Sequence, residues 1–182
     1  MEVKYSEIHK ELIEACKKGD RISYYRLYKL YSKAMYNTCY RFFNNKEQAE
    51  DILQESFTEA FANLKKFRYE SSFGAWLKKI VVNKCINELK RKKIRLEFTD
   101  NFPVHEYDDD NEPETLNYNL EVKKILNAIE KLSPGYKIIL SLYLFEGYDH
   151  TEIAQILNIS ESTSKSQYMR AKKRLKEILI NN

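Results

Sequence analysis

Apolar residues recur at the three- and four-residue spacing of an α-helix along most of this chain, and few residues would interrupt a helix. The 182 residues include only 4 Gly and 3 Pro, and the strict apolar–polar alternation of strands is scarce. The pattern therefore predicts an all-α fold. Three apolar stripes in the first half predict three long helices around one core. They are Tyr24, Leu27, Tyr28, Tyr31, Met35, Cys39; Ile52, Leu53, Phe57, Ala60, Phe61, Leu64; and Trp76, Leu77, Ile80, Val81, Ile86, Leu89.

An acidic segment separates this first region from a second helical one. Residues 97–116 contain eight acidic residues and no Lys or Arg, although the whole chain has a net charge of +4. Two prolines and the run 108–110 of three aspartates leave no helical period there. The segment is either a solvated, self-repelling tether or a functional acidic stretch that occupies a basic, nucleic-acid-like site. We predict two small helical domains joined by an acidic linker, with bounds 5–92, 93–118 and 119–182.

Composition and motifs argue against a secreted, membrane-inserted or enzymatic protein. The N-terminal residues are charged throughout, and the longest apolar run, 138–145, is too short to cross a bilayer, so we expect a cytoplasmic protein. The three cysteines and three histidines are scattered without metal-ligand spacing, so we expect buried, reduced thiols. The sequence contains no phosphate-cradling glycine loop, nucleophile elbow or zinc-binding helix motif. We therefore predict no catalytic residue, no metal and no cofactor.

Residues 148–179 predict two helices joined by a tight turn, the second long and basic. Asp149 and Glu152 have the spacing of a capping box at the start of the first helix. Asn158 suits the left-handed backbone that ends a helix, and Ser160 can cap the next one.

The second of these helices has a packing side and a polar, basic side. The packing stripe is Ser164, Tyr168, Ala171, Leu175 and Ile178. The opposite side carries Ser162, Thr163, Ser166, Gln167, Arg170, Lys173 and Arg174. Such side chains can hydrogen-bond base edges and neutralise phosphates, as a reader of the DNA major groove does. A helical hairpin with a solvated basic face is the alternative, but the turn residues favour a helix-turn-helix.

Three features of the first region go beyond packing. Residues 47–55 predict a helix with an acidic outer surface, for which a purely structural role at a helix N-terminus is the alternative. Residues 67–76 predict a non-helical connection rich in aromatic and hydroxyl side chains. The following helix ends in a dense basic run, 84–95. Aromatic rings beside cations are what unstacked, single-stranded bases require.

Taken in order, these segments resemble one family, the extracytoplasmic-function (ECF) group of bacterial RNA polymerase sigma factors. Residues 49–91 resemble sigma domain two, a three- to four-helix bundle, with a matching helix at 24–45, and residues 132–179 resemble sigma domain four, a helix-turn-helix. The resemblance implies a non-enzymatic transcription initiation factor that binds core RNA polymerase and promoter DNA, both duplex and single-stranded. In this family the acidic linker runs through the RNA path of the polymerase. Members are often inhibited by an anti-sigma factor, which would be a further partner.

The resemblance also implies a role for particular residues. Those that would bind the clamp helices of core polymerase are Asp51, Gln54 and Glu55. Those that would engage the melted −10 element are Ser71, Ser72, Phe73, Trp76, Asn83, Asn87, Lys90 and Arg91, although Trp76 suits a core role equally well. Those that would read the −35 duplex are Ser162, Thr163, Lys165, Ser166, Gln167, Arg170 and Lys173.

Three positions depart from the family pattern. Ser164 stands where many members have Val, and its hydroxyl either bonds back to a backbone carbonyl or is accommodated by different local packing. Gln167 stands where many have Arg, and a glutamine could pair bidentately with adenine. Asn158 stands where Gly is frequent. A helix-turn-helix regulator that binds its own duplex site would explain residues 132–179 equally well, but it leaves the first region without a role.

Overall fold

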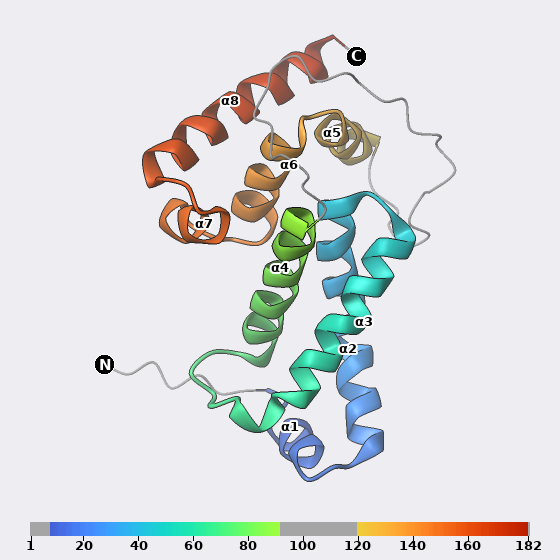
Figure 1. Ribbon diagram of the computed structural model, residues 1–182. Helices are drawn as coiled ribbons and strands as arrows, with labels where there is room; N and C mark the ends of the chain where they lie inside the picture. Colours follow the sequence, from blue (N-terminus) through green and yellow to red (C-terminus); the bar gives the residue numbers. More distant parts are fainter. Residues whose placement is uncertain (1–7, 92–119, 182) are drawn as a thin grey trace. The chain divides into compact units, whose positions relative to one another are not determined.

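A computed structural model of the chain describes residues 8–91 and 120–181, and within those ranges every regular element is a helix (Figure 1). The predicted all-α fold class is confirmed. The chain divides into two compact units, residues 1–92 and 93–182, which are called unit 1 and unit 2 below. Residues 93–118, the predicted linker, lie outside the described residues, so the linker and the domain bounds around it stay predictions.

Unit 1 is a bundle in which three long helices pack pairwise and a short one lies across their end. Helices α2, α3 and α4 contact one another, and α1 contacts α2 and the short turn η1. The bounds are α1 Lys10–Lys17, α2 Arg21–Phe43, α3 Lys46–Ala62, η1 Leu64–Lys66 and α4 Phe73–Arg91. Helix α1 was not among the helices predicted from the apolar stripes.

Short polar residues fix the ends of α2 and the start of α3. The Asp20 carboxylate accepts hydrogen bonds from the backbone N–H groups of Ile22 and Ser23, at 3.3 and 3.1 Å, and so caps α2. Asn44 ends α2 in the left-handed conformation, with φ 48°, and the side chain of Asn45 caps α3. Because only these two residues connect the helices, α2 and α3 are antiparallel neighbours.

Aromatic rings join the first two predicted stripes of unit 1, on α2 and α3, within the core. Ring centroids lie 4.8 Å apart for Tyr24 and Phe61 and 4.7 Å apart for Tyr28 and Phe57, in edge-to-face geometry. Such pairs add roughly 0.5–1.5 kcal/mol each beyond the burial of their area. The centre of the core is completely buried and contains Leu27, Cys39, Leu77, Val81 and Cys85.

Unit 2 is built around one buried helix. Helix α6 and the π-helical turn η2 supply the fully buried side chains Ile138, Ile139, Leu140 and Leu142. Helix α8 packs on α5, α6 and α7. The bounds are α5 Leu120–Glu130, α6 Pro134–Leu140, η2 Ser141–Phe145, α7 His150–Leu157 and α8 Glu161–Ile180. Gly147, with φ 75°, makes the turn between η2 and α7 in a conformation that side chains rarely adopt.

The longest apolar run of the sequence is buried over residues 138–142 and exposed at Tyr143, Leu144 and Phe145. Its residues form the end of α6 and all of η2. Nowhere in ranges 8–91 and 120–181 is a helix long and apolar enough to cross a bilayer.

The three cysteines are buried as free thiols, which confirms the prediction from their spacing. Cys16, Cys39 and Cys85 each have no exposed surface. Burial, together with the negative charge of Asp20, raises the pKa of the Cys16 thiol to about 11.

We expect the native protein to resist thiol reagents. At pH 8 only about one Cys16 side chain in a thousand is the reactive thiolate, and all three sulfur atoms are shielded. Treatment with 5,5′-dithiobis(2-nitrobenzoate) should therefore show no fast reaction, whereas the unfolded chain in guanidinium should react at 3 thiols. A thiol that reacts within seconds in the folded protein would contradict this packing.

Candidate functional site

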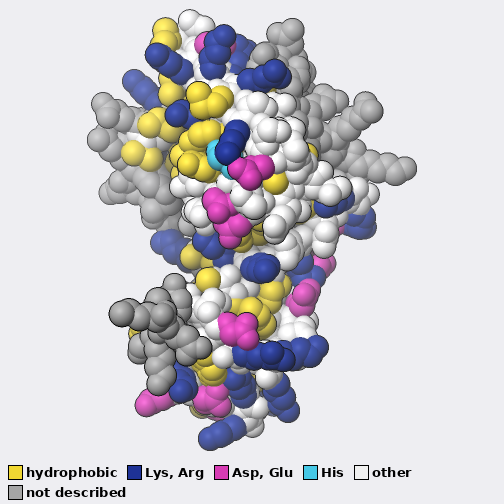
Figure 2. Space-filling view, turned by 90° about the vertical axis from the view of Figure 1, so that its left-hand side faces the viewer, with side chains coloured by type: hydrophobic (Ala, Val, Ile, Leu, Met, Phe, Trp, Pro, Cys, Tyr) yellow, Lys and Arg dark blue, Asp and Glu magenta, His cyan; other side chains and the backbone are white. Residues whose placement is uncertain are grey.

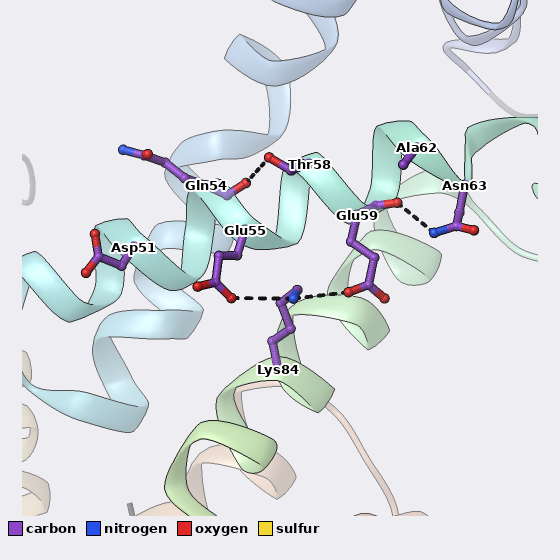
Figure 3. A pocket seen from close by; sticks show the side chains of 8 residues that line it. All are labelled: Asp51, Gln54, Glu55, Thr58, Glu59, Ala62, Asn63 and Lys84. Atoms are coloured by element: carbon purple, nitrogen blue, oxygen red, sulfur yellow. Dashed lines mark hydrogen bonds and ion pairs between the residues drawn. The ribbon is translucent and has the colours of Figure 1, made fainter. Parts of the chain in front are cut away.

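The outer side of α3 is acidic, as predicted. Glu47, Asp51, Gln54 and Glu55 are exposed, while the opposite side of the same helix is buried in the core. Figure 3 shows that Asp51 and Gln54 point away from α4 and that Glu55 is directed toward it. The three residues that the resemblance assigns to polymerase binding are therefore on one side of one helix, but only two of them point freely into solvent.

Lys84 of α4 joins two glutamates of α3. Its Nζ lies 3.5 Å from Glu55 Oε2 and 3.1 Å from Glu59 Oε2 (Figure 3). Partial burial acts to lower the pKa of Lys84, but the hydrogen bonds and charges of Glu59 and Glu55 raise it above its ordinary value. The ammonium group therefore stays charged and holds α3 and α4 together.

A shallow groove beside this ion pair brings two sets of predicted residues together. It is lined by Glu55 and Glu59 of α3 and by Asn83, Asn87 and Arg91 of α4. The sequence analysis assigned Glu55 to polymerase binding and the α4 residues to promoter DNA. It did not single out Glu59 or pair Lys84 with α3. One feature of the sequence could have indicated these ion pairs: Glu55 and Glu59 are four residues apart and so lie on one face of their helix, where a lysine of a neighbouring helix can reach both.

The predicted −10 surface lies mainly along α4. Asn83, Asn87, Lys90 and Arg91 are exposed, and we call them the α4 face. Asn87 follows Asn83 by four residues, and Lys90 and Arg91 follow Asn87 by three and four, so all four lie toward one side of the helix. The Arg91 guanidinium pairs with the Glu88 carboxylate at 2.7 and 2.8 Å. Part of the positive charge at this end of the helix is thereby neutralised within the chain.

The non-helical connection is shorter than the sequence predicted. Residues 67–72 are not regular helix, but α4 already begins at Phe73, so the prediction of a non-helical segment up to residue 76 was wrong. The cause is local: Ser72 Oγ accepts a hydrogen bond from the Ala75 N–H at 3.2 Å, as a helix cap does.

Helix packing determines which aromatic rings of this region are exposed and could stack on a base. Phe73 is completely buried, with its ring against Tyr31, Phe67 and Trp76, so its ring is not presented to a base. Trp76 is half-buried, with its ring 5.2 Å from that of Phe67. Ser72 is exposed and Ser71 partly so.

Helix α1, which lies outside the three predicted apolar stripes, holds the connection in place. Tyr69 has φ 62°, a left-handed conformation that costs energy for a residue with a side chain. Its hydroxyl donates to Glu14 at 2.5 Å, and Lys17 Nζ lies 4.4 Å from the centre of its ring. Lys17 also donates to the Phe67 carbonyl at 3.2 Å. The hydrogen bonds from Tyr69 and Lys17 lower the pKa of Glu14 below its ordinary value.

In unit 2 the predicted helix-turn-helix caps are confirmed. Asp149 and Glu152 form a reciprocal capping box at the start of α7. Asn158 ends α7 with φ 56°, and Ser160 Oγ accepts the Thr163 N–H at 3.1 Å to start α8. Four-residue caps depend on adjacent residues only, which is why they could be read from the sequence.

Most of the predicted −35 residues lie on the open side of α8. Ser162, Lys165, Ser166, Arg170 and Lys173 are exposed. Thr163 and Gln167 are only partly exposed, and Lys165 pairs with Glu161 at 2.6 Å. The amide oxygen of Gln167 is buried without a hydrogen-bond partner, so pairing with adenine requires another side-chain conformation.

The hydroxyl group of Ser164 forms its hydrogen bond with a side chain rather than with a backbone carbonyl. The residue is completely buried, and its Oγ lies 2.9 Å from Nδ1 of His150, the first residue of α7. The His150 ring stacks on Tyr143 with centroids 4.8 Å apart, and Tyr168 of α8 closes the cluster. Figure 2 shows a histidine at the edge of a group of hydrophobic side chains, with Lys or Arg and Asp or Glu side chains beside it. The sequence suggestion of a bond to a backbone carbonyl was wrong; the second suggestion, different local packing, describes what is observed.

Comparison with known proteins identifies the family. Residues 27–94 match the family described as Sigma-70 region 2, and residues 123–175 match Sigma-70, region 4. The chain is 30% identical over 179 residues to the ECF RNA polymerase sigma factor SigW of Bacillus subtilis, covering 93% of this chain and 96% of that protein. The chain belongs to the ECF group of RNA polymerase sigma factors.

Other relatives agree with this assignment. The ECF sigma factor SigM of Bacillus subtilis is 27% identical, over 84% of this chain and 92% of its own length. Among solved structures, the sigma factor RpoE of Bartonella quintana, in complex with the anti-sigma factor NepR, has a similar fold. Its TM-score is 0.60 at 21% identity, over 85% of this chain and 94% of that one. CnrH, in complex with the cytosolic domain of CnrY, has a TM-score of 0.56 at 20% identity, over 95% and 97% of the two chains.

As an ECF sigma factor, the protein is a transcription initiation factor rather than an enzyme. It directs RNA polymerase to promoters, and its partners are core polymerase and promoter DNA. The match to region 2 also decides between the two interpretations of the sequence, because a helix-turn-helix regulator has no need of unit 1.

The contact between His150 and Ser164 should contribute measurably to the stability of this sigma factor. A double-mutant cycle with His150→Ala and Ser164→Ala, measured by urea unfolding, should give a coupling energy of about 0.5–1.5 kcal/mol. Ser166→Ala is the matched control, because this serine lies on the same helix but bonds to the Thr163 carbonyl, and its coupling to His150→Ala should be near zero. Additive effects of the first pair would show that the 2.9 Å contact does not stabilise the helix-turn-helix.

Proposed function

We propose that this sigma factor divides its work among three helices: α3 binds core polymerase, α4 captures the melted −10 strand, and α8 reads the −35 duplex. The observation that supports the division best is the placement of an acidic face on α3 and a polar, basic face on α4 of the same bundle. Because α3 and α4 pack directly, docking of the first would bring the second to a fixed position on the polymerase.

On α3, the polymerase contacts proposed are Asp51, Gln54 and Glu55. Asp51 and Gln54 need no rearrangement, since they already point into solvent. Glu55 forms an ion pair with Lys84, so a contact between Glu55 and polymerase would compete with that ion pair.

On α4, Asn83 and Asn87 offer amide groups that can hydrogen-bond the edges of unpaired bases, and Lys90 and Arg91 can neutralise phosphates. Unpairing a base costs a few kcal/mol, which several such contacts can offset. We assign Phe73 a supporting role, because its buried ring anchors the connection that carries Ser71 and Ser72. The half-buried Trp76 can present only part of its ring to a base.

On α8, the exposed cations Arg170 and Lys173 would contact phosphates, and Ser162, Thr163, Lys165, Ser166 and Gln167 would face the groove. Since phosphate contacts dominate, affinity for promoter DNA should fall steeply with salt. We propose that the protein acts in the cytoplasm, where the polymerase is. Because RpoE and CnrH were each solved with a partner, the first named as an anti-sigma factor, we also propose that an anti-sigma factor binds this chain.

Substitutions on α3 and α4 should separate polymerase binding from promoter opening. Asn83→Ala with Lys90→Ala should abolish open-complex formation, detected by permanganate reactivity of unpaired thymines, and leave the affinity for core polymerase unchanged. Asp51→Lys should reduce that affinity at least about tenfold, because it reverses a charge at the centre of the docking face.

A matched control removes the same two residue types elsewhere on unit 1. Asn63→Ala with Lys66→Ala removes the 2.9 Å hydrogen bond between those side chains and the 3.0 Å hydrogen bond from Asn63 to the Glu59 carbonyl, and should affect neither measurement. Loss of polymerase binding in the Asn83 and Lys90 variant, or normal promoter opening by it, would overturn the assignment of α4.

A further inference from the structure

The solvent side of α2 is basic and contains no acidic residue. Exposed residues on this side, which we call the α2 face, are Arg21, Ile22, Tyr25, Arg26, Lys29, Leu30 and Lys33. We propose that the α2 face is an additional binding surface for single-stranded nucleic acid. This surface is distinct from the α4 face and is not needed for the function proposed above.

The positive charges on α2 destabilise the helix on which they lie. Its 23 residues include no Asp or Glu, whereas every other α-helix of eight or more residues in the described ranges has at least one. Lys29 lies three residues after Arg26 and four before Lys33, spacings at which like charges repel. Arg21 is in the first turn, where the helix dipole disfavours a cation. A solvated surface helix normally mixes both signs, so this pattern indicates a polyanionic partner.

None of the four cations forms an ion pair within the described part of the chain, although the Asp20 carboxylate that caps α2 attracts Arg26. Arg21, Arg26, Lys29 and Lys33 form no ion pair there, in contrast to Lys84, Arg91 and Lys165. Their charge is therefore available to phosphates.

Aromatic rings accompany these cations along the helix. Tyr25 is 62% exposed although Tyr24 and Tyr28 beside it pack in the core, and Lys29 Nζ lies 5.8 Å from its ring centre. Tyr25, Lys29, Lys33, Tyr36 and Tyr40 step by four, four, three and four residues and so follow one side. They span about 22 Å, which is several nucleotides of an extended strand.

This composition favours a single strand over the other polyanions. Tyrosine rings can stack on unpaired bases, and cations can follow the backbone, which gives binding without sequence preference. A duplex reader would need base-edge donors and acceptors of the kind found on α8, such as Ser, Gln and Arg side by side. The amide side chain nearest to the α2 face is Asn37, which is only partly exposed, whereas the α4 face presents the exposed Asn83 and Asn87.

Salt dependence tests the proposal with the full-length protein. The probe is a fluorescent 15-nucleotide oligothymidylate, and binding is followed by anisotropy from 0.05 to 0.5 M salt. Lys29→Gln with Lys33→Gln removes two phosphate contacts and should reduce the slope of log K against log salt by about 1.4. Because the substitutions also relieve repulsion within α2, the variant should melt no lower than the wild type.

The matched control removes the same charge at two exposed lysines outside the α2, α4 and α8 faces. Lys18→Gln with Lys65→Gln should leave the slope unchanged. Equal slopes for the Lys29 and Lys33 variant and for the control would overturn the proposal. Loss of core-polymerase affinity by the α2 variant with unchanged oligonucleotide binding would also overturn it, because the face would then contact protein.

Photo-crosslinking locates the strand directly. An oligonucleotide containing 5-iodouracil should crosslink to Tyr25, Tyr36 or Tyr40, and crosslinks restricted to α4 and α8 would contradict the proposal. Failure of the function proposed above can be distinguished from failure of this proposal. In the former case, neither the wild-type protein nor the control variant would form a polymerase-dependent open complex.

Discussion

The packing of α3 against α2 and α4 is the constraint on which the first unit depends. One side of α3 is buried through Ile52, Leu53, Phe57 and Ala60, and edge-to-face ring pairs attach it to α2. With that side committed to the core, only the opposite, acidic side is left for a partner. The ion pair of Lys84 with Glu55 and Glu59 then fixes α4 beside it, so the surfaces proposed for polymerase and for DNA are carried by one bundle.

Features that depend on neighbouring residues could be predicted from the sequence, and features that depend on distant contacts could not. The capping box of Asp149 and Glu152 spans four residues, and the apolar stripes follow the helical repeat, so both were recoverable. The burial of Phe73 depends on Tyr31 and Phe67, and the bond of Ser164 depends on His150, fourteen residues away. The contacts of helix α1 with Tyr69, through Glu14 and Lys17, join residues far apart in the sequence, so they could not be predicted from it.

Charge is distributed over unit 1 by helix rather than evenly. Helix α3 presents carboxylates, the α4 face presents amides with cations, and the α2 face presents cations with tyrosines. In this account the same bundle meets a protein through one side and nucleic acid through others. Unit 2 carries the surface proposed for duplex recognition on α8. Near the start of that helix, Ser164 bonds to His150, and the amide oxygen of Gln167 is buried without a hydrogen-bond partner.

The central claim is that one chain both binds core polymerase and selects promoters. In vitro transcription of genomic DNA fragments with core polymerase, with and without the protein, tests that claim most directly. The account predicts new start sites that depend on the protein and share two sequence elements at a fixed spacing upstream. Absence of new start sites, together with tight binding of the protein alone to duplex sites, would contradict it and would favour a regulator that acts without unit 1.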